Sequence, residues 1–222
     1  MKYRGILLSV LIAAAAQINA QSISVSRYLM MLDGDIAPTM GISNKAILAL
    51  SLQQDNEEAR DIMMNSFQIV QHLVDSATQY RINDINHLEG CARYSNMGIP
   101  ISSTKKAAKS CDESMYAVLN IAIEAGATTT SETTVGSGDL SGTETKVKAK
   151  PIIIVTLKLA DSSGKQTQKF VGKYKHEEAV SMSQQSLSIG KFDLPLDFES
   201  DVIPFYSFIS EATYELVKQM SN

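Results

Sequence analysis

The sequence contains no tryptophan, and only 6% of its residues are aromatic. This composition disfavours a protein that stacks sugar rings on exposed aromatic side chains, although tyrosine or phenylalanine could take that role. The three histidines, His72, His87 and His176, are far apart, and no HExxH motif or His/Cys cluster with zinc spacing occurs. We therefore expect neither a metal nor a cofactor.

Recognisable catalytic motifs are also missing. The chain has no GxSxG nucleophile elbow and no glycine-rich phosphate loop. The carboxylates at Asp193, Asp197, Glu199 and Asp201 could supply an acid pair, but a solvated loop before the last helix is the simpler interpretation. Asp33-Gly34-Asp35 lacks the further acidic ligands of an EF-hand and is predicted to be a turn. A non-enzyme is therefore favoured over an enzyme.

Long apolar runs are absent as well. The run from Ile6 to Ala16 has about 11 residues, whereas a membrane-spanning helix needs roughly 20. A short positively charged segment precedes this run and the small residue Ala20 follows it, which is the pattern of a cleavable signal peptide. We expect residues 1–20 to be removed near Ala20, and residues 21–222 to be a soluble periplasmic or secreted protein. An uncleaved membrane anchor is the alternative.

The chain has only two cysteines, Cys91 and Cys111. In an oxidising compartment two such cysteines usually form a disulfide. A loop of this length stabilises a fold by about 3 kcal/mol in the chain-entropy model. A redox-active or nucleophilic thiol is the alternative, but the pair is not CxxC and no basic residues mark either thiol as activated. The sequence therefore predicts a structural disulfide.

Positive charge is concentrated in one segment, although the whole chain carries a formal net charge of −4. Residues 146–175 contain eight lysines and one acidic residue. Within this segment residues 152–175 have the alternation of a β-hairpin, with Phe170, Gly172 and Tyr174 on one face of the returning strand. The lysines proposed to meet an anionic partner are Lys158, Lys169, Lys173 and Lys175. Alternatively, these lysines protect an exposed edge strand or pair with acidic parts of the same chain.

Hydrophobic periodicity predicts helices in both halves of the chain. Residues 55–81 have the spacing of a long amphipathic helix, and residues 43–52 precede it with a shorter helical pattern. A helix is expected over 111–125, with a Ser110–Glu113 capping box and Gly126 as its C-terminal cap. Residues 203–220 predict the last helix. A start at Ser103 is disfavoured because three lysines would crowd the positive end of that helix.

Between these helices, residues 22–29 could pair as a strand, and the Thr/Ser/Gly-rich stretch 128–145 is typical of a flexible linker. The predicted fold class is α+β: a helical N-terminal half, with one long and one shorter helix, packs with a C-terminal antiparallel hairpin or small sheet. The terminal helix covers that sheet. Residues 21–222 are expected to form one domain, with 128–145 as an excursion from it.

Export, a disulfide and the absence of catalytic motifs together favour a non-catalytic binding or assembly component of a bacterial cell envelope. The expected partner is another envelope protein or an anionic envelope polymer, and nucleic acid is not expected. Two alternatives stay open. One is a secreted hydrolase with a divergent active site, and the other is a secreted effector that acts at a membrane.

Overall fold

The computed structural model describes residues 20–34, 36–136, 140–189, 192–200 and 205–221 of the chain. The predicted signal peptide, residues 1–20, lies outside this part except for Ala20. The helices are η1 (Ala37–Met40), α2 (Asn44–Leu52), α3 (Glu57–Ala77), α4 (Thr104–Ser110) and α5 (Phe205–Met220). The strands are β1 (Gln21–Leu32), β2 (Tyr80–Ile82), β3 (Met115–Gly136), β4 (Leu140–Asp161), β5 (Gln166–Lys175), β6 (Val180–Ile189) and β7 (Phe192–Ser200).

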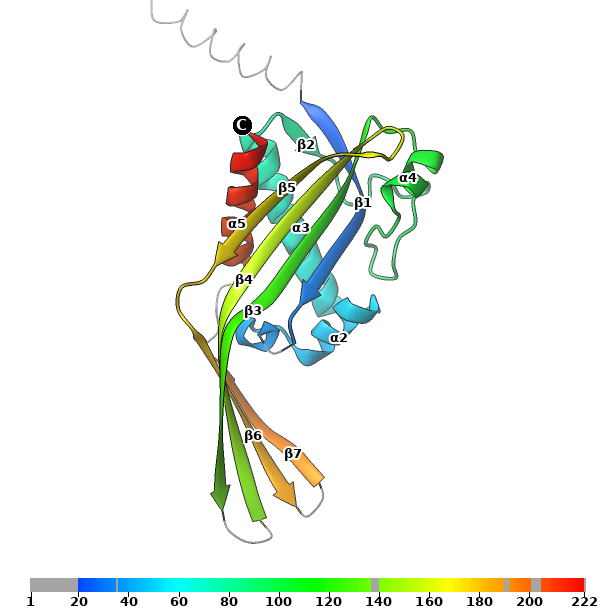
Figure 1. Ribbon diagram of the computed structural model, residues 1–222. Coiled ribbons are helices and arrows are strands. Elements are labelled where there is room, and N and C mark those ends of the chain that lie inside the picture. Colours follow the sequence, from blue (N-terminus) through cyan, green and yellow to red (C-terminus); the bar gives the residue numbers. More distant parts are fainter. Residues whose placement is uncertain (1–19, 35, 137–139, 190–191, 201–204, 222) are drawn as a thin grey trace, which may run out of the picture.

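One mixed sheet of seven strands runs through the whole structure in the order β2-β1-β3-β4-β6-β7, and β5 also pairs with β4. Strand β1 is parallel to β2 and β3, and the other pairs are antiparallel. Strands β3 and β4 have 22 residues each, and at about 3.4 Å per residue each spans roughly 75 Å. They are therefore longer than the layer of helices beside them (Figure 1).

The length of β3 and β4 divides the sheet into two regions, which we call the body and the arm. In the body, residues 152–160 of β4 pair with β5, and β1 pairs with the first part of β3. The arm consists of residues 128–136 of β3, residues 140–149 of β4, β6 and β7, which form an antiparallel sheet. Figure 1 shows the arm projecting from the end of the body where α2 lies.

The predicted fold class, a helical N-terminal half with a small C-terminal sheet, is wrong. The sheet begins at Gln21, and the predicted helix 111–125 is instead occupied largely by the first half of β3. Ala117, Leu119, Ile121 and Ile123 are buried at every second position, which is the period of a strand with one face on the core. The Ser110–Glu113 capping box is likewise not formed, because α4 ends at Ser110.

Gly126, predicted as a helix cap, lies inside β3 next to a register shift between Ala125 and Thr128. A Cβ atom at this position would lie 2.7 Å from the carbonyl oxygen of Lys150. The glycine therefore permits two backbones to approach closely at the junction of body and arm.

The described residues of the Thr/Ser/Gly-rich stretch expected to be a linker, 128–136 and 140–145, are strand. Residues 128–136 pair with residues 141–149 in an unbroken antiparallel register. Threonine is β-branched and favours strands, and the pairing with β6 satisfies the second edge of β4. Composition alone indicated disorder because the stretch has few large apolar residues, but backbone pairing holds the described residues in the sheet.

The helical predictions near the N-terminus are confirmed, with small shifts at the caps. The Ser43 side chain caps α2, and the Asn56 side chain caps α3 by accepting a hydrogen bond from the Ala59 amide. Helix α4 starts after Ser103, although a helix start there was not expected because of the three lysines that follow. The Ser103 side chain caps this helix by accepting a hydrogen bond from the Lys106 amide. The last helix, α5, is also confirmed, and residues 201–204 lie outside the described part.

Helices α3 and α5 pack against each other and cover one face of the body sheet, which we call the inner face (Figure 1). The apolar stripes of both helices join the inner side chains of β1, β3 and β4 in one core. At Gly172 on β5 the sheet and α5 approach closely, since a Cβ there would lie 1.8 Å from the carbonyl oxygen of Ala212. Any side chain at this position would push α5 away from the sheet.

We predict that Gly172→Ala lowers the free energy of unfolding by about 3 kcal/mol or more, since overpacking of a tight core typically costs 1–3 kcal/mol and this contact is with backbone. Urea unfolding followed by circular dichroism measures the change. Gly34→Ala is the matched control, because a Cβ at Gly34 meets nothing within 4 Å. Equal stability of the two variants would show that α5 does not pack on β5 as described.

Candidate functional site

The face of the body sheet opposite α3 and α5, which we call the outer face, carries the lysines predicted to bind a partner. In β4 the residues at odd positions from Ile153 to Leu159 are fully buried, and the residues between them are only half-buried. Successive side chains of a strand point to opposite faces, so the half-buried set lies on the outer face. Helices α3 and α5 pack on the inner face, so these two helices leave the outer face open.

Cross-strand register places all four predicted lysines on the outer face. Lys158 is directly opposite Lys169, while Lys173 is opposite Ile154 and Lys175 is opposite Ile152. Lys169, Lys173 and Lys175 are exposed, and Lys158 is half-buried. The structure therefore brings the four side chains to one surface along β5 and its neighbour β4.

Arg27, which the sequence analysis did not single out, extends this basic region across the sheet. The register runs from Arg27 on β1 to Val118 on β3 and then to Lys158 on β4. Like charges opposite each other in a sheet are destabilising, so the Lys158–Lys169 pair has a cost that the fold tolerates. Within the described part of the chain, none of the four predicted lysines forms an ion pair.

An apolar strip lies beside the lysines on the same face. Met31 on β1 is opposite Ala122 on β3, Ala122 is opposite Ile154 on β4, and Ile154 is opposite Lys173. Ile154 and Ala122 are half-buried, and the Met31 side chain is 57% exposed. The nearly continuous apolar runs at 117–123 and 152–155 were the sequence signal for this strip. The strip was missed because 111–125 was assigned to a helix.

The predicted disulfide is confirmed and lies beside the outer face of the body. Cys91 and Cys111 are bonded, with a Cα–Cα distance of 5.3 Å. The Tyr116 hydroxyl donates to the carbonyl oxygen of Cys111 at 2.6 Å. Burial raises the pKa of Tyr116, so this hydroxyl keeps its proton at neutral pH. The bond thus joins the segment before β3 to the turn after β2.

A serine, a carboxylate and a histidine meet near the disulfide, but in an order that differs from a hydrolase triad. The Ser24 hydroxyl donates to Glu113 at 3.0 Å, and His87 Nε2 lies 2.8 Å from the other carboxylate oxygen. In a serine hydrolase the histidine stands between serine and carboxylate and removes the serine proton. Here the carboxylate lies between the serine and the histidine, and Ser24 is fully buried. This network therefore has a structural role and links three segments of the chain.

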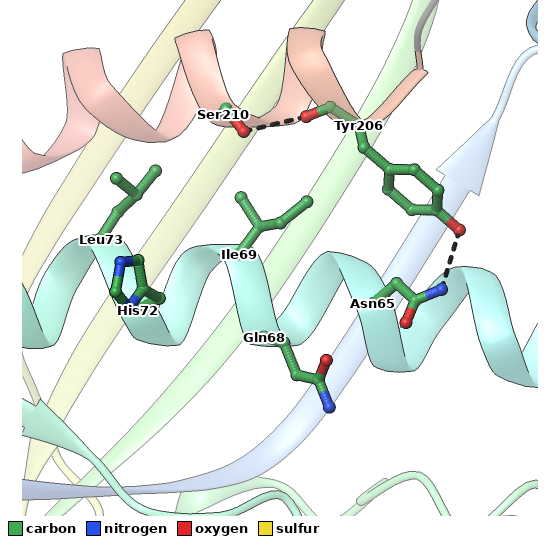
Figure 2. Close-up of a pocket in the computed structure, with 7 residues that line it drawn as sticks. All are labelled: Asn65, Gln68, Ile69, His72, Leu73, Tyr206 and Ser210. Carbon is green, nitrogen blue, oxygen red and sulfur yellow. Dashed lines mark hydrogen bonds between the residues drawn. The ribbon is translucent and has the colours of Figure 1, made fainter.

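A shallow groove of about 560 Å³ lies between α3 and α5 on their exposed side. Figure 2 shows its floor of Ile69 and Leu73, with the Tyr206 ring at one end. The Asn65 amide donates to the Tyr206 hydroxyl at 3.2 Å. The groove contains His72 but no carboxylate. Among the described residues no group of histidine, cysteine and acidic side chains is arranged to hold a metal ion.

The body and arm define a protein with one mixed, mostly antiparallel sheet, one face of which is covered by α3 and α5. Comparisons with known proteins add little to this description. No protein-family model matches the chain, and no curated protein matches it. A solved structure of a neuraminyllactose-binding hemagglutinin homolog from Helicobacter pylori is 10% identical with a TM-score of 0.35, covering 92% of this chain and 87% of that one. A lipoprotein from Neisseria meningitidis is 15% identical with a TM-score of 0.21, covering 70% and 83%.

Both TM-scores are too low to carry over a fold, a function or a site from these two proteins. The helices within the described ranges are all too short or too polar to cross a membrane.

We predict that replacing both cysteines, Cys91→Ser with Cys111→Ser, lowers the free energy of unfolding by about 3 kcal/mol, because the unfolded chain then gains the entropy of an open loop. Thermal and urea unfolding of the oxidised protein and the double variant measure this difference. The oxidised protein treated with a reducing agent is the control, and it should match the double variant. A variant as stable as the oxidised protein would contradict a structural role for the bond.

Proposed function

We propose that this chain is an exported, non-catalytic binding component of a bacterial cell envelope, and that its outer face binds an anionic partner. That partner is the acidic face of another envelope protein or an anionic envelope polymer. The observation that carries the proposal is a row of lysines that form no ion pair with any described residue. They lie beside a partly exposed apolar strip, on a sheet face that α3 and α5 leave open.

The chemistry of this face suits binding rather than packing within the chain. Stable interfaces combine an apolar centre with a charged rim that stays in contact with water. On the outer face Ile154 and Ala122 supply the centre, while Lys169, Lys173 and Lys175 follow one side of it. Lysines without ion-pair partners raise the local positive potential and speed the approach of an anionic surface.

A disulfide in the body supports placement outside the cytosol, since such bonds persist in oxidising compartments. The order of Ser24, Glu113 and His87 supports a binding protein over a serine hydrolase, because the histidine cannot reach the serine proton across the carboxylate. The edge-protection role of the lysines is compatible with binding, because β5 is an edge strand of the body.

The first test identifies the partner by cross-linking the native protein in its envelope fraction, followed by mass spectrometry. We predict that the triple variant Lys169→Glu, Lys173→Glu, Lys175→Glu weakens binding about tenfold or more. Three pairs of roughly 0.5 kcal/mol each contribute about 1.5 kcal/mol, and a tenfold change corresponds to about 1.4 kcal/mol. The loss should shrink as salt is raised, because exposed charges are screened. Binding is measured by titration at two ionic strengths.

The matched control reverses the three exposed lysines of α4, Lys105→Glu, Lys106→Glu and Lys109→Glu. This variant has the same net charge as the β5 variant but leaves the edge of the outer face unchanged. Equal loss of binding in the two variants would show that net charge alone attracts the partner. Unchanged binding in the β5 variant would contradict the proposed site.

A substitution at Met31 distinguishes an interface with direct apolar contacts from a long-range electrostatic attraction. Because its side chain is 57% exposed, we predict that Met31→Ser changes the free energy of unfolding by less than about 0.5 kcal/mol. The same variant should weaken partner binding several-fold through lost apolar contact, and this loss should not depend on salt. Leu48→Ser, at an equally exposed leucine on α2, is the control for removal of an exposed apolar side chain. If Met31→Ser binds normally, the apolar strip is not part of the interface.

A further inference from the structure

The arm ends in two free strand edges that the proposed function does not use. In the order β3-β4-β6-β7, strands β4 and β6 are paired on both sides. Within the described residues, the arm part of β3 and the whole of β7 are each paired on one side. Half of their backbone N–H and C=O groups therefore point away from the sheet, and such an edge is a template for pairing with another strand.

The β3 edge lacks the lysines and prolines that commonly protect a free edge. Residues 128–136 contain no lysine and no proline, and Glu132 is their single charged residue. The outer edge of β5 in the body differs. It carries Lys169, Lys173 and Lys175, and edge lysines oppose edge-to-edge pairing. The Gln219 side chain of α5 also hydrogen-bonds the Val171 backbone at this edge. The contrast between two edges of one sheet indicates that the arm edge is built to be paired.

The two arm edges match each other in length. The free part of β3 runs over residues 128–136, and β7 has 9 residues. Pro195 in β7 lacks an N–H, but it lies at a register shift next to Ser186, the kind of position where an edge strand tolerates proline. Two such edges could form about nine backbone hydrogen bonds, since antiparallel pairs exchange two bonds at alternate residues.

The directions of the strands also match. From the body, β3 runs outward, β4 returns, β6 runs outward and β7 returns. When two copies stand side by side in the same orientation, the outward β3 of one copy therefore meets the returning β7 of the next. The alternation of an antiparallel sheet continues across the boundary without a break. A three-strand arm would place two outward strands together and would lack this property.

Exposed apolar side chains lie at the same end of the body. Met31 is next to the end of β1, and Leu48 and Leu52 are on α2, which contacts β1; the three are 57%, 57% and 56% exposed. Figure 1 shows α2 at the end of the body from which the arm projects. A neighbouring copy whose arm lies alongside would bring its body near these side chains.

We propose that copies of this chain associate through their arms, with the β3 edge of one copy paired in antiparallel register with the β7 edge of the next. Each copy then uses two different edges, so the contact is head-to-tail and leads to a closed ring or an open filament. The proposal goes beyond the function assigned to the outer face, because it needs none of the lysines on β5.

The test uses the full mature chain from Gln21, with a photoreactive phenylalanine analogue in place of Ser131, an exposed residue on the β3 edge. We expect illumination to give covalent multimers in which residue 131 of one copy is joined to residues 192–200 of another. Within one copy the two edges are three strand spacings apart, about 14 Å, so the mass of the adduct separates the two cases. The same analogue in place of the exposed Thr167 on β5 is the control and should give no multimers.

Sedimentation of the unmodified mature chain supplies the second measurement, with an assembly of several copies as the expected result. The triple variant Lys169→Glu, Lys173→Glu, Lys175→Glu should keep that mass, so failure of the outer face and failure of the arm contact are distinguishable. The proposal is overturned by a monomer at every concentration tested. It is equally overturned by cross-links from residue 131 to a different protein, or by equal multimers from the Thr167 position.

Discussion

The structure depends on the antiparallel pairing of β3 with β4, which continues from Met115 and Asp161 at one end to Gly136 and Ser141 at the other. Strand β1 pairs with β3, while β5 and β6 pair with different parts of β4. Because one ladder serves both regions, the body and the arm share two strands instead of being joined by a linker. The register shift between Ala125 and Thr128 marks the boundary between them.

The same ladder separates the chemistry of the two faces. Side chains alternate along each strand, so the apolar residues at odd positions of β4 reach the core under α3 and α5, and Lys158 is left on the outer face. On β5, Gly172 allows α5 to approach closely, and the lysines on either side of it point away from that helix. The close packing of α5 on the inner face thus fixes which side of the sheet presents the positive charge.

Sequence reasoning predicted those features that depend on local patterns. The spacing of apolar residues gave α3 and α5, alternation gave the β4–β5 hairpin with its lysine face, and the cysteine count gave the bond between Cys91 and Cys111. Each of these signals is contained within a few dozen neighbouring residues. The lysines of the candidate site could therefore be named, although what surrounds them could not.

The sheet was missed because its stability comes from pairing between distant segments. The short apolar run in 115–123 fits both a helix and a strand in an isolated window, and only its parallel pairing with β1 selects the strand. Residues 128–145 have little to bury, and composition therefore indicated a linker. Residues 128–136 are nevertheless paired with β4, and residues 140–145 are paired with β3 and β6. The apolar strip beside the lysines depends on the same long-range register and could not be predicted without it.

Amide hydrogen exchange along β3 and β4, resolved to single residues, tests the continuous ladder most directly. The structure predicts slow exchange at residues 141–149 of β4, which are paired on both sides, at rates approaching those of the body residues 152–160. In the monomer it predicts alternating fast and slow amides at residues 128–136 of β3, which are paired on one side. Exchange at the rate of an unstructured peptide throughout 128–149 would contradict the ladder and support the prediction of a flexible linker.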